Sequence, residues 1–509
     1  MSGDLLAVLV LVPVAGALLH AFIPARSERT HKVVALAVST GLFLLSLALV
    51  AGFRPEPGMQ FEVSRDWMPN LGIRYHVGVD GLSLWLIILT TFLTPVALLG
   101  SWNIHHRVKA FQIFMLLLEA GMLGVFVALD LFLFYIFWEA MLIPMYFLIG
   151  IWGHERRIYA AVKFFLYTMA GSALMLVAFI ALYKMSPAHT FDILALAQQP
   201  VEPALQMWLF GAFALAFAIK VPMFPFHTWL PDAHVEAPTA GSVILAGVML
   251  KMGGYGFLRL AFPLFPDAAQ RFAPWIGALA VVGIIYGALV SLVQPNLKKL
   301  VAYSSVSHLG FVMLGIAAFT TTSVVGAVYQ MLNHGISTGA LFLCVGMLYD
   351  RRHTFAISEY GGLKSVMPWF SSLFLLICLS SLAVPGLNGF VGEFLILMGS
   401  WLLSRPMVAL ASLGVILAAA YILWMVQRVL YGEVTNPANR TLPDLSAREF
   451  VVLVPLVVLA IVMGVASPYF TRLIEPSVQT LIYETKSRAR GASAPTRAAV
   501  LEAPAEGTR

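Results

Sequence analysis

Ala218-Ile-Lys-Val-Pro-Met-Phe-Pro-Phe226 interrupts a long apolar run with one lysine and two prolines, and the fold prediction starts from this interruption. The surrounding run, residues 206–226, has the length of about 20 residues that an α-helix needs to cross a bilayer. A second interruption, Leu382-Ala-Val-Pro-Gly-Leu-Asn-Gly-Phe390, lies in the run 368–402. Because Pro and Gly are frequent in membrane helices, either interruption taken alone would be an ordinary kink.

The composition places most of the chain in lipid. Of its 509 residues, 60% are hydrophobic and 11% are charged, with a mean hydropathy of +0.87, whereas a soluble domain is about 45–50% apolar and about 25% charged. The net charge of +6 comes from scattered basic residues without interleaved aromatics, so we expect no nucleic-acid partner. Cys344 and Cys378 lie in apolar runs without a CxxC partner, so no structural zinc is predicted.

Apolar runs recur along the whole chain, and we predict one all-α integral membrane domain with about fourteen transmembrane helices. Lipid-facing backbone must be hydrogen-bonded within its own segment, and these runs are too long and too uniformly apolar for barrel strands. The first run lacks a basic region before it and a small-residue cleavage site, so we expect a retained helix. The runs are 4–23, 32–52, 80–100, 109–127, 129–150, 160–183, 206–226, 239–261, 274–293, 300–318, 323–348, 368–402, 407–428 and 450–468.

Lys and Arg are distributed unequally between alternate loops, which predicts the orientation. Cytoplasmic loops carry the excess of these residues, so we expect both termini on the outer side of the membrane. The segment from Arg472 to Arg509 holds six more basic residues and opposes the trend, but it is rich in Ala, Pro, Arg and Ser and is predicted to be disordered. The sixteen residues of the richer side are Arg26, Arg29, Lys32, Arg107, Lys109, Arg156, Arg157, Lys163, Lys298, Lys299, Arg351, Arg352, Lys364, Arg428, Arg440 and Arg448, against six on the other side, Arg54, Arg65, Arg74, Lys184, Arg271 and Arg405.

The spacing of the two interruptions predicts an internal repeat. Pro222 and Pro385 are about 163 residues apart, and the runs that begin near 109 and 274 are about 165 apart. Two copies of an odd number of helices are inverted relative to each other, and a broken helix in each copy marks the ion path in many transporters. We therefore divide the chain into N-terminal helices (1–108), a first five-helix repeat (109–262), a second (274–430), and a last helix with a C-terminal tail (431–509).

Several ionisable residues lie deep inside these runs. A charge at mid-membrane costs about 2.5–3.5 kcal/mol on insertion scales and is a functional candidate by default. Asp130 and Arg259 lie near helix ends, where an interfacial position explains them equally well. Glu119 is deeper and suits either a relay or a contact with a neighbouring subunit. The candidate proton-transfer residues are Glu139, Lys220, Lys251, His308, His334 and Glu393.

The sequence contains no Walker A loop, no Rossmann glycine fingerprint and no zincin helix, so we expect a proton path and no metabolite-binding active site. His308 and His334 would suit two haem ligands on neighbouring helices. Beside a series of Lys and Glu residues, a proton relay is the interpretation that we favour.

Two further motifs have structural interpretations. His227 and His234 resemble a metal-binding loop, but Pro231 and their seven-residue spacing argue against a shared helical face, so we expect hydrogen bonding within a loop. Gly253-Gly254-Tyr255-Gly256 lies inside an apolar run and predicts close packing between helices.

Four longer stretches resemble a known family. They closely resemble the chain M family of bacterial NADH-quinone oxidoreductase, respiratory complex I, and the resemblance extends from the first helix to the last and is weakest in the tail. The stretches are Phe137-Trp-Glu-Ala-Met-Leu-Ile-Pro-Met-Tyr-Phe-Leu-Ile-Gly150, Trp229-Leu-Pro-Asp-Ala-His-Val-Glu-Ala-Pro-Thr-Ala-Gly-Ser242, Ala302-Tyr-Ser-Ser-Val-Ser-His-Leu-Gly-Phe311 and Asn388-Gly-Phe-Val-Gly-Glu-Phe394.

The resemblance implies one of three antiporter-like proton channels in the membrane arm, with fourteen helices and inverted repeats. It implies that Glu139 is the acid of helix 5, that Lys220 is its partner on broken helix 7, and that Lys251 is the central lysine. His308 and His334 resemble the connecting relay. Glu393 matches the outlet residue on broken helix 12, where the two sister chains look different and carry Lys.

The same resemblance implies the surroundings of the chain. The flavin and the iron–sulfur clusters are expected in partner subunits, and no cofactor or metal is expected in this chain. The expected partners are the other membrane-arm subunits, including the sister antiporter-like chains, in the bacterial inner membrane.

Related families and one different class remain as alternatives. Multi-subunit cation–proton antiporters and the membrane chains of energy-converting hydrogenases share the fold and many motifs, but residues 234–242 and Glu393 favour the complex I family. A purely structural membrane scaffold would not need several buried ionisable residues.

Overall fold

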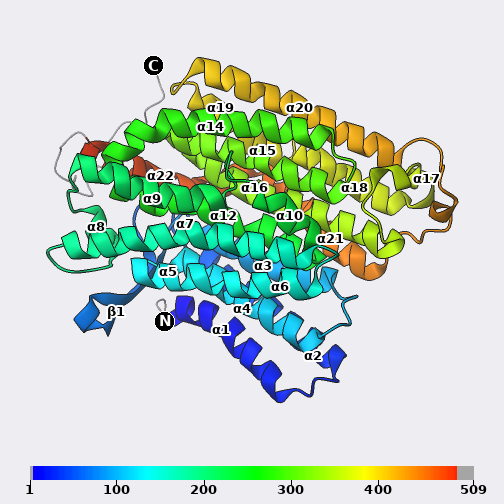
Figure 1. The fold of residues 1–509 in the computed structure, drawn as a ribbon, viewed down its shortest axis with the longest axis horizontal. Helices are drawn as coiled ribbons and strands as arrows, with labels where there is room; N and C mark the ends of the chain where they lie inside the picture. Colours follow the sequence, from blue (N-terminus) through cyan, green and yellow to red (C-terminus); the bar gives the residue numbers. More distant parts are fainter. Residues whose placement is uncertain (1–3, 490–509) are drawn as a thin grey trace.

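The computed structural model describes residues 4–489, which form an elongated bundle of antiparallel helices (Figure 1). Among these residues, twelve helices are long and apolar enough to cross a membrane, and Leu84–Gly100 and Pro368–Ser381 are shorter apolar helices. The chain is therefore a multi-pass membrane protein, and the predicted helical membrane fold is confirmed apart from one hairpin described below. The number of fourteen crossings and the inverted repeats stay predictions.

Most of the long helices are continuous, and several begin at a side-chain cap. Thr320 and Ser323 exchange hydrogen bonds at the start of α16, and Ser446 and Glu449 do so at the start of α21, which satisfies N–H groups that a helix terminus otherwise leaves unpaired. The continuous helices are α1 (Asp4–Phe22), α2 (Glu28–Gly52), α3 (Leu84–Gly100), α4 (Val108–Val127), α7 (Arg157–Met185), α14 (Pro266–Leu292), α15 (Leu297–Ala318), α16 (Thr321–Arg352), α20 (Arg405–Leu430), α21 (Ala447–Val465) and α22 (Ser467–Ala489), and the short elements are α8 (Ile193–Ala197), α17 (Leu363–Val366), η1 (Pro69–Leu71), η4 (Ile357–Glu359) and η5 (Pro437–Asn439).

Both predicted interruptions are present. Residues 221–228 separate α9 (Pro203–Lys220) from α10 (Trp229–Glu236), and residues 382–387 separate α18 (Pro368–Ser381) from α19 (Asn388–Ser400). Each break leaves backbone groups without helical partners inside the bundle, where they are available to polar side chains.

Two further irregular helices were not predicted. The run 129–150 is divided into α5 (Leu131–Ala140) and α6 (Leu142–Trp152), because Pro144 has no N–H to donate to the carbonyl one turn earlier. The helix from Thr239 to Leu264 consists of α11 (Thr239–Ile244), the π-helical segment η2 (Leu245–Met249), α12 (Lys251–Gly256), the π-helical segment η3 (Phe257–Ala261) and α13 (Phe262–Leu264).

The prediction of an exclusively helical chain misses one antiparallel hairpin, formed by β1 (Gln60–Met68) and β2 (Ile73–Val79). The hairpin lies between two apolar runs, and outside lipid the exposed edge of a two-stranded sheet can be hydrated. Gly72, in the turn, has a φ of 63°, a left-handed conformation that favours glycine.

The prediction of a disordered tail from Arg472 is wrong as far as Ala489, because residues 467–489 form α22. Leu473, Ile474, Val478 and Ile482 recur at helical spacing and are buried against the bundle, so this segment has an apolar stripe that a composition count overlooks. The remainder of the predicted tail, 490–509, lies outside the described residues.

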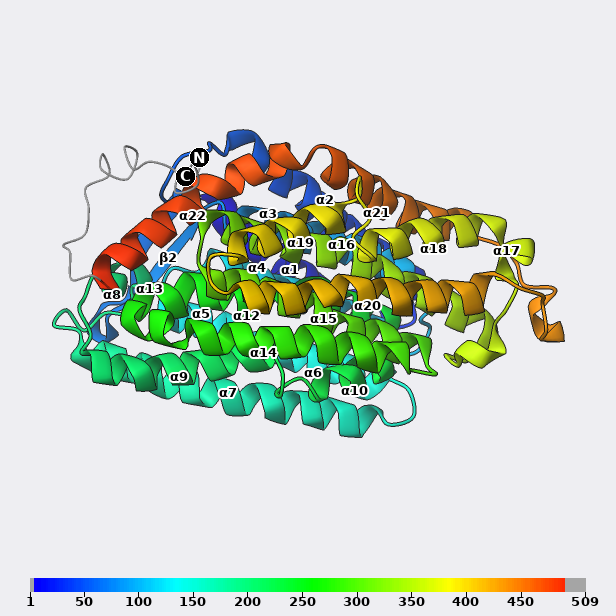
Figure 2. The same cartoon turned by 90° about the horizontal axis from the view of Figure 1, so that it is seen from above.

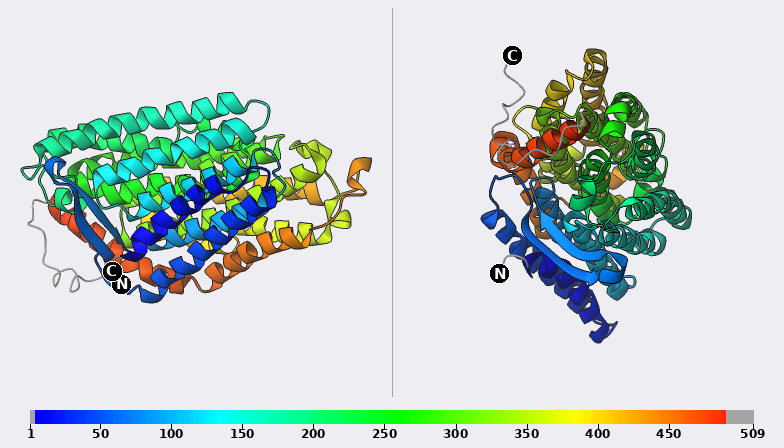
Figure 3. Two further views of the ribbon diagram at one scale, coloured as in Figure 1. Left: turned by 90° about the horizontal axis from the view of Figure 1, so that it is seen from below. Right: turned by 90° about the vertical axis from the view of Figure 1, so that its left-hand side faces the viewer.

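The two ends of the bundle differ. The hairpin and α22 lie at one end, which we call the hairpin end (Figure 3). Asp4 contacts Arg65 of the hairpin, and Arg488 of α22 donates to the carbonyl of Pro263, so the described chain begins and finishes at this end. The opposite end, which we call the basic end, holds the loops after α1, α3, α6, α14, α16 and α20.

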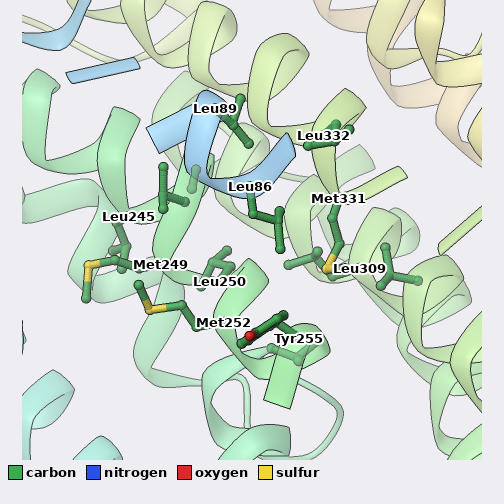
Figure 4. Packing of buried hydrophobic residues seen from close by; sticks show 14 of the residues in the cluster. Leu86, Leu89, Leu245, Met249, Leu250, Met252, Tyr255, Leu309, Met331 and Leu332 are labelled. Carbon is green, nitrogen blue, oxygen red and sulfur yellow. The ribbon is translucent and has the colours of Figure 1, made fainter. Parts of the chain in front are cut away.

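The centre of the bundle contains the most deeply enclosed helices. The most apolar stretches of α16 and of the segment Thr239–Leu264 are completely buried, and that of α15 nearly so, whereas less than half of the corresponding stretches of α2 and α20 is buried. Figure 2 shows α14 and α20 side by side at the surface. Leu86, Met249, Leu250 and Met331 pack around the centre (Figure 4).

Close packing at Gly253 and Gly256 is confirmed. A Cβ at Gly253 would lie 2.5 Å from Val221, and one at Gly256 would lie 2.5 Å from the ring of Phe217. Both contacts are too short for any side chain, so these glycines allow α12 to approach α9 and the broken helix.

Candidate functional site

Lys251 lies at the start of α12, between the two π-helical segments, and is fully buried. Its ammonium Nζ donates to the carbonyl of Ala246, inside the first π segment, and lies 2.6 Å from Nδ1 of His334 on α16. Single-turn π segments in membrane and soluble helices are frequent at functional sites, because they change the direction of side chains and the availability of carbonyls. The π segment thus helps to hold the lysine against a histidine from another helix.

His334 faces a second histidine. The ring centroids of His334 and His308, from α16 and α15, are 6.2 Å apart. Between the helices lies a cavity of about 10 Å³ lined by both histidines and by polar side chains, and roughly 10–15 Å³ is what one water needs. The other lining residues are Gln330, Asn333, Ser337, Thr338, Ser380, Ser381 and Gly389.

Glu393 terminates this row on α19, just beyond the second helix break. Its Oε1 accepts from Nε2 of Gln330 at 3.0 Å and lies 2.9 Å from Nδ1 of His308. Nε2 of His308 contacts the hydroxyls of Tyr421 at 3.1 Å and Ser381 at 3.4 Å. Both nitrogens of the His308 imidazole therefore have protonatable or polar partners, one toward Glu393 and one toward hydroxyl groups.

The break before α19 is fixed by Asn388. Its carbonyl accepts from Nδ2 of Asn333 at 2.8 Å, and its side-chain oxygen accepts from the hydroxyl of Ser380. These bonds tie α18 and α19 to α16 and so set the height at which Glu393 meets His308.

The structure thus brings four of the six predicted residues into one row, Lys251–His334–His308–Glu393. We call this the central row. Its members come from α12, α16, α15 and α19, and each is at most 3% exposed.

Glu139 of α5 and Lys220, the last residue of α9, lie outside this row and do not contact each other. The charge of Glu139 acts on Lys220, yet no ion pair within 4.0 Å joins them among the described residues. Among the described residues the Lys220 ammonium has no hydrogen-bond partner. It lies 5.2 Å and 5.8 Å from the ring centroids of Trp138 and Phe164, a cation–π arrangement. Their predicted pairing stays a prediction.

Glu139 is less enclosed than its sequence context suggests. The residue is half-buried in the isolated chain, and Ala140, Ile143 and Phe147 on the same stretch are exposed. An apolar run reports the depth of a residue in the membrane but not the direction of its side chain, so the predicted depth of Glu139 stays a prediction, and one of its carboxyl oxygens is buried without a partner among the described residues.

His227 and His234 are functional candidates that the sequence interpretation missed. His234 lies on α10 and His227 just before it; both are buried, and none of their ring nitrogens has a hydrogen-bond partner among the described residues. Outside strict hydrogen-bond geometry the His227 ring interacts with the carbonyl of Pro225 in its own loop, so the expected loop bonding fails only for His234, which lies on a helix. Pro231 occupies the first turn of α10, where proline is tolerated, and because His227 precedes this helix the two histidines do not share a helical face, as expected.

Asp130, Glu119 and Arg259 have different surroundings. Asp130 caps α5, accepting from the N–H groups of Phe132, Leu133 and Arg74, which is a structural role. Glu119 is fully buried on α4, and neither carboxyl oxygen has a hydrogen-bond partner among residues 4–489. Arg259 forms a buried ion pair with Asp80.

A separate cluster of charged groups stabilises the hairpin. His76 of β2 lies 2.7 Å from Asp192, the cap of α8, and 2.8 Å from Glu62 of β1. Burial alone lowers the pKa of His76, but the hydrogen bonds and charges of Asp192 and Glu62 outweigh it and raise the pKa above 6.5. Burial raises the pKa of Asp192, and the bonds to His76 and to backbone N–H groups outweigh it, which leaves this pKa below 3.8.

Within the described residues, no group of three or more His, Cys, Asp or Glu side chains is placed to hold a metal ion.

A membrane-embedded bundle with two broken helices and a row of buried lysine, histidine and glutamate defines the class of antiporter-like membrane subunits.

Comparison with known proteins specifies the family. Residues 128–418 match the family model described as NADH:quinone oxidoreductase/Mrp antiporter, transmembrane. The chain is 48% identical over 497 residues to NADH-quinone oxidoreductase subunit M of Rhodobacter capsulatus, covering 94% of this chain and 96% of that one. The chain therefore belongs to the NADH:quinone oxidoreductase/Mrp antiporter family, within which it is similar to subunit M.

Solved structures agree in fold. A chain of respiratory complex I from Thermus thermophilus with bound NADH matches with a TM-score of 0.87 and 33% identity, covering 94% of this chain and 99% of that one. A chain of the Mrp complex from Dietzia sp. DQ12-45-1b matches with a TM-score of 0.81 over 95% and 99% of the two chains, but at 21% identity it shows the fold alone.

Proposed function

We propose that this chain is a proton-translocating subunit in the membrane arm of an NADH-quinone oxidoreductase, respiratory complex I. The observation that carries the proposal is the central row, in which Lys251, His334, His308 and Glu393 follow one another inside the bundle at hydrogen-bond or ring-contact distances. The similarity to subunit M supports the assignment of the complex.

The central row can transfer protons stepwise. Nδ1 of His334 faces the Lys251 ammonium, and its ring lines the small cavity shared with His308. An imidazole can take a proton at one nitrogen and release one at the other, so His334 can pass a proton from the lysine toward the cavity. His308 faces the hydroxyl of Ser381 on the cavity side and Glu393 on the far side, and repeats the step.

The energy requirement favours several coupled sites. Moving a proton against about 200 mV costs roughly 4.6 kcal/mol, and two unit charges about 8 Å apart interact by roughly 2 kcal/mol at an effective dielectric near 20. One coupled pair is therefore too little, two come close to the requirement, and three exceed it. The central row together with Glu139 and Lys220 offers that number.

We infer that electron transfer takes place in partner subunits and that this chain holds no redox centre. Both ring nitrogens of His308 have side-chain partners, and Nδ1 of His334 faces Lys251, which suits a relay better than a pair of haem ligands. The expected partners are the other membrane-arm subunits, including the sister antiporter-like chains. We place both termini, and so the hairpin end, on the outer side of a bacterial inner membrane, because the loops at the basic end carry most of the Lys and Arg residues.

The test replaces Glu139 or Lys220 by alanine in the assembled complex and measures NADH-driven proton uptake in reconstituted vesicles. We expect proton uptake to be lost in both variants while NADH oxidation under uncoupled conditions continues. The matched control is Lys32→Ala, since Lys32 is also buried but donates to the carbonyl of Trp102 at the basic end, away from the central row. Normal proton-coupled turnover in Lys220→Ala would refute the assignment of this lysine.

A cation–proton antiporter subunit is the second candidate, favoured by the shared fold of the Mrp chain. The same vesicles distinguish the two: proton uptake driven by NADH in medium free of Na⁺ and K⁺ gradients supports the oxidoreductase subunit. Proton movement that requires a Na⁺ or K⁺ gradient would support the antiporter.

A further inference from the structure

Arg259 lies between the central lysine and the hairpin end. It is placed on the second π segment of the helix that carries Lys251, eight residues nearer that end, which corresponds to about 12 Å along the helix. The side chain is only 8% exposed. Nothing in the central row explains a buried guanidinium at this height.

The guanidinium is held on two sides. Its Nε donates to the hydroxyl of Tyr255 at 3.1 Å, and a terminal nitrogen forms an ion pair with Asp80. The Tyr255 hydroxyl in turn donates to the carbonyl of Phe126. Oδ1 of Asp80 also accepts from the N–H groups of Leu82 and Ser83, so this carboxylate oxygen is held in place beside the guanidinium.

A cavity adjoins this cluster at the hairpin end. Its volume is about 290 Å³, and Asp80, Arg259, Glu484 and Arg488 are among its lining residues. A polar cavity of this size holds several waters, so water can reach the outer side of Arg259. Tyr255, one helical turn from Lys251, is on the inner side.

The chemistry of the cluster opposes proton passage. A guanidinium is always protonated in proteins and can neither take nor give a proton. It forms an ion pair with Asp80, an acid that lines the same cavity. Water from the cavity therefore meets a group that cannot exchange protons before it meets Tyr255 and Lys251.

We propose that the Arg259–Asp80 pair is a proton insulator that separates Lys251 from the hairpin end, so that protons on Lys251 leave along the central row toward Glu393. This proposal rests on the proposed function, since it assigns a direction to the same path. It adds a residue that determines the route without itself carrying a proton.

The experiment measures passive proton conductance. The assembled complex is reconstituted into vesicles without NADH, a potassium diffusion potential is imposed with valinomycin, and internal pH is recorded. Arg259→Gln frees Asp80 to exchange protons and also ends the repulsion between the guanidinium and a proton on Lys251. That repulsion, over about 12 Å at an effective dielectric near 20, corresponds to a factor of about ten, so we expect the conductance to rise about tenfold. Arg259→Lys keeps a cation beside Asp80, yet an ammonium can release its proton, so a smaller rise is expected.

Further variants separate insulation from packing. Asp80→Asn alone leaves the guanidinium in place and should remain as tight as the wild type, and Arg259→Gln with Asp80→Asn should fall back toward the wild type because no acid remains. Arg351→Gln is the matched control, since Arg351 is similarly buried but pairs with Glu449 at the basic end.

Vesicles of Arg259→Gln or Arg259→Lys as tight as the wild type would overturn the proposal, and so would a double variant as leaky as Arg259→Gln, which would indicate a packing defect. NADH-driven proton uptake by the wild type in the same vesicles tests the proposed function separately. Tight Arg259 variants beside a wild type that pumps would refute the insulator alone.

Discussion

Replacing Glu393 distinguishes a proton-transfer group from a packing residue, because two substitutions differ in what they remove. Both hydrogen bonds to Glu393, from His308 and Gln330, end on the same carboxyl oxygen. In Glu393→Gln the amide oxygen can accept both bonds at the same distances, but the side chain can no longer take or release a proton. In Glu393→Ala both bonds are lost as well.

The expected magnitudes follow from these contacts. A hydrogen bond to a charged group contributes about 1.5–3 kcal/mol and one between neutral groups about 0.5–1.5, so Glu393→Gln, which changes two such bonds, lowers the free energy of unfolding by about 2–3 kcal/mol. Glu393→Ala leaves two buried donors without an acceptor, at about 1–3 kcal/mol each. The two variants should therefore differ in stability but agree in losing most proton uptake.

The assay compares NADH-driven proton uptake in reconstituted vesicles with NADH oxidation under uncoupled conditions, which controls for assembly. Glu393→Lys retains a titratable group and should keep part of the proton uptake. Proton uptake by Glu393→Gln equal to the wild type would refute the reasoning, and Glu393 would then be a hydrogen-bonding residue with the outlet elsewhere.

The remaining predictions concern the other end of the row, the redox question and the hairpin. Lys251→Met removes the donor to Ala246 and His334 and should abolish proton uptake with uncoupled NADH oxidation retained; full uptake would exclude Lys251 from the path. The chain purified alone should show no haem absorbance and no paramagnetic iron signal, and a stoichiometric haem lost in His308→Ala would contradict this. The raised pKa of His76 contributes stability that is complete below pH 6.5 and is lost as the pH rises through the pKa of the folded state. The lowered pKa of Asp192 contributes stability that is present above pH 3.8 and is lost as the pH falls through the pKa of the folded state. Amide exchange of residues 60–79 should therefore be slowest between these two pH values, and a rate independent of pH after correction for intrinsic exchange would show that the cluster contributes nothing.

Much of the fold could be predicted from residue order alone. The apolar runs located the membrane helices, and both proline-containing interruptions are breaks in the structure. The π segments around Lys251 could not be predicted from the sequence. A π segment changes the hydrogen-bond register of the helix by one residue, and this change depends on which backbone carbonyls accept hydrogen bonds from neighbouring side chains. Helix α22 was missed because the overall composition of the tail concealed a local apolar stripe.

The candidate site was predictable as a set of residues but not as an arrangement. Insertion cost marks Lys251, His334, His308 and Glu393 as exceptional wherever they are placed in the bundle. His227 and His234 were set aside although both are buried without partners, because a sequence contains no direct sign of an unsatisfied nitrogen.

By itself, then, the sequence determined that this protein lies in the membrane, where its helices break, and which buried groups can carry a proton. Only the tertiary structure decided which of these groups meet. The contact of Lys251 with His334 joins residues 83 positions apart, and that of His308 with Glu393 joins residues 85 apart. The same structure turned Glu139 partly outward and paired Arg259 with Asp80. The physical reason is that hydrophobicity fixes the depth of a residue in the bilayer, whereas the rotation of each helix and the choice of its neighbours follow from side-chain packing across the whole bundle.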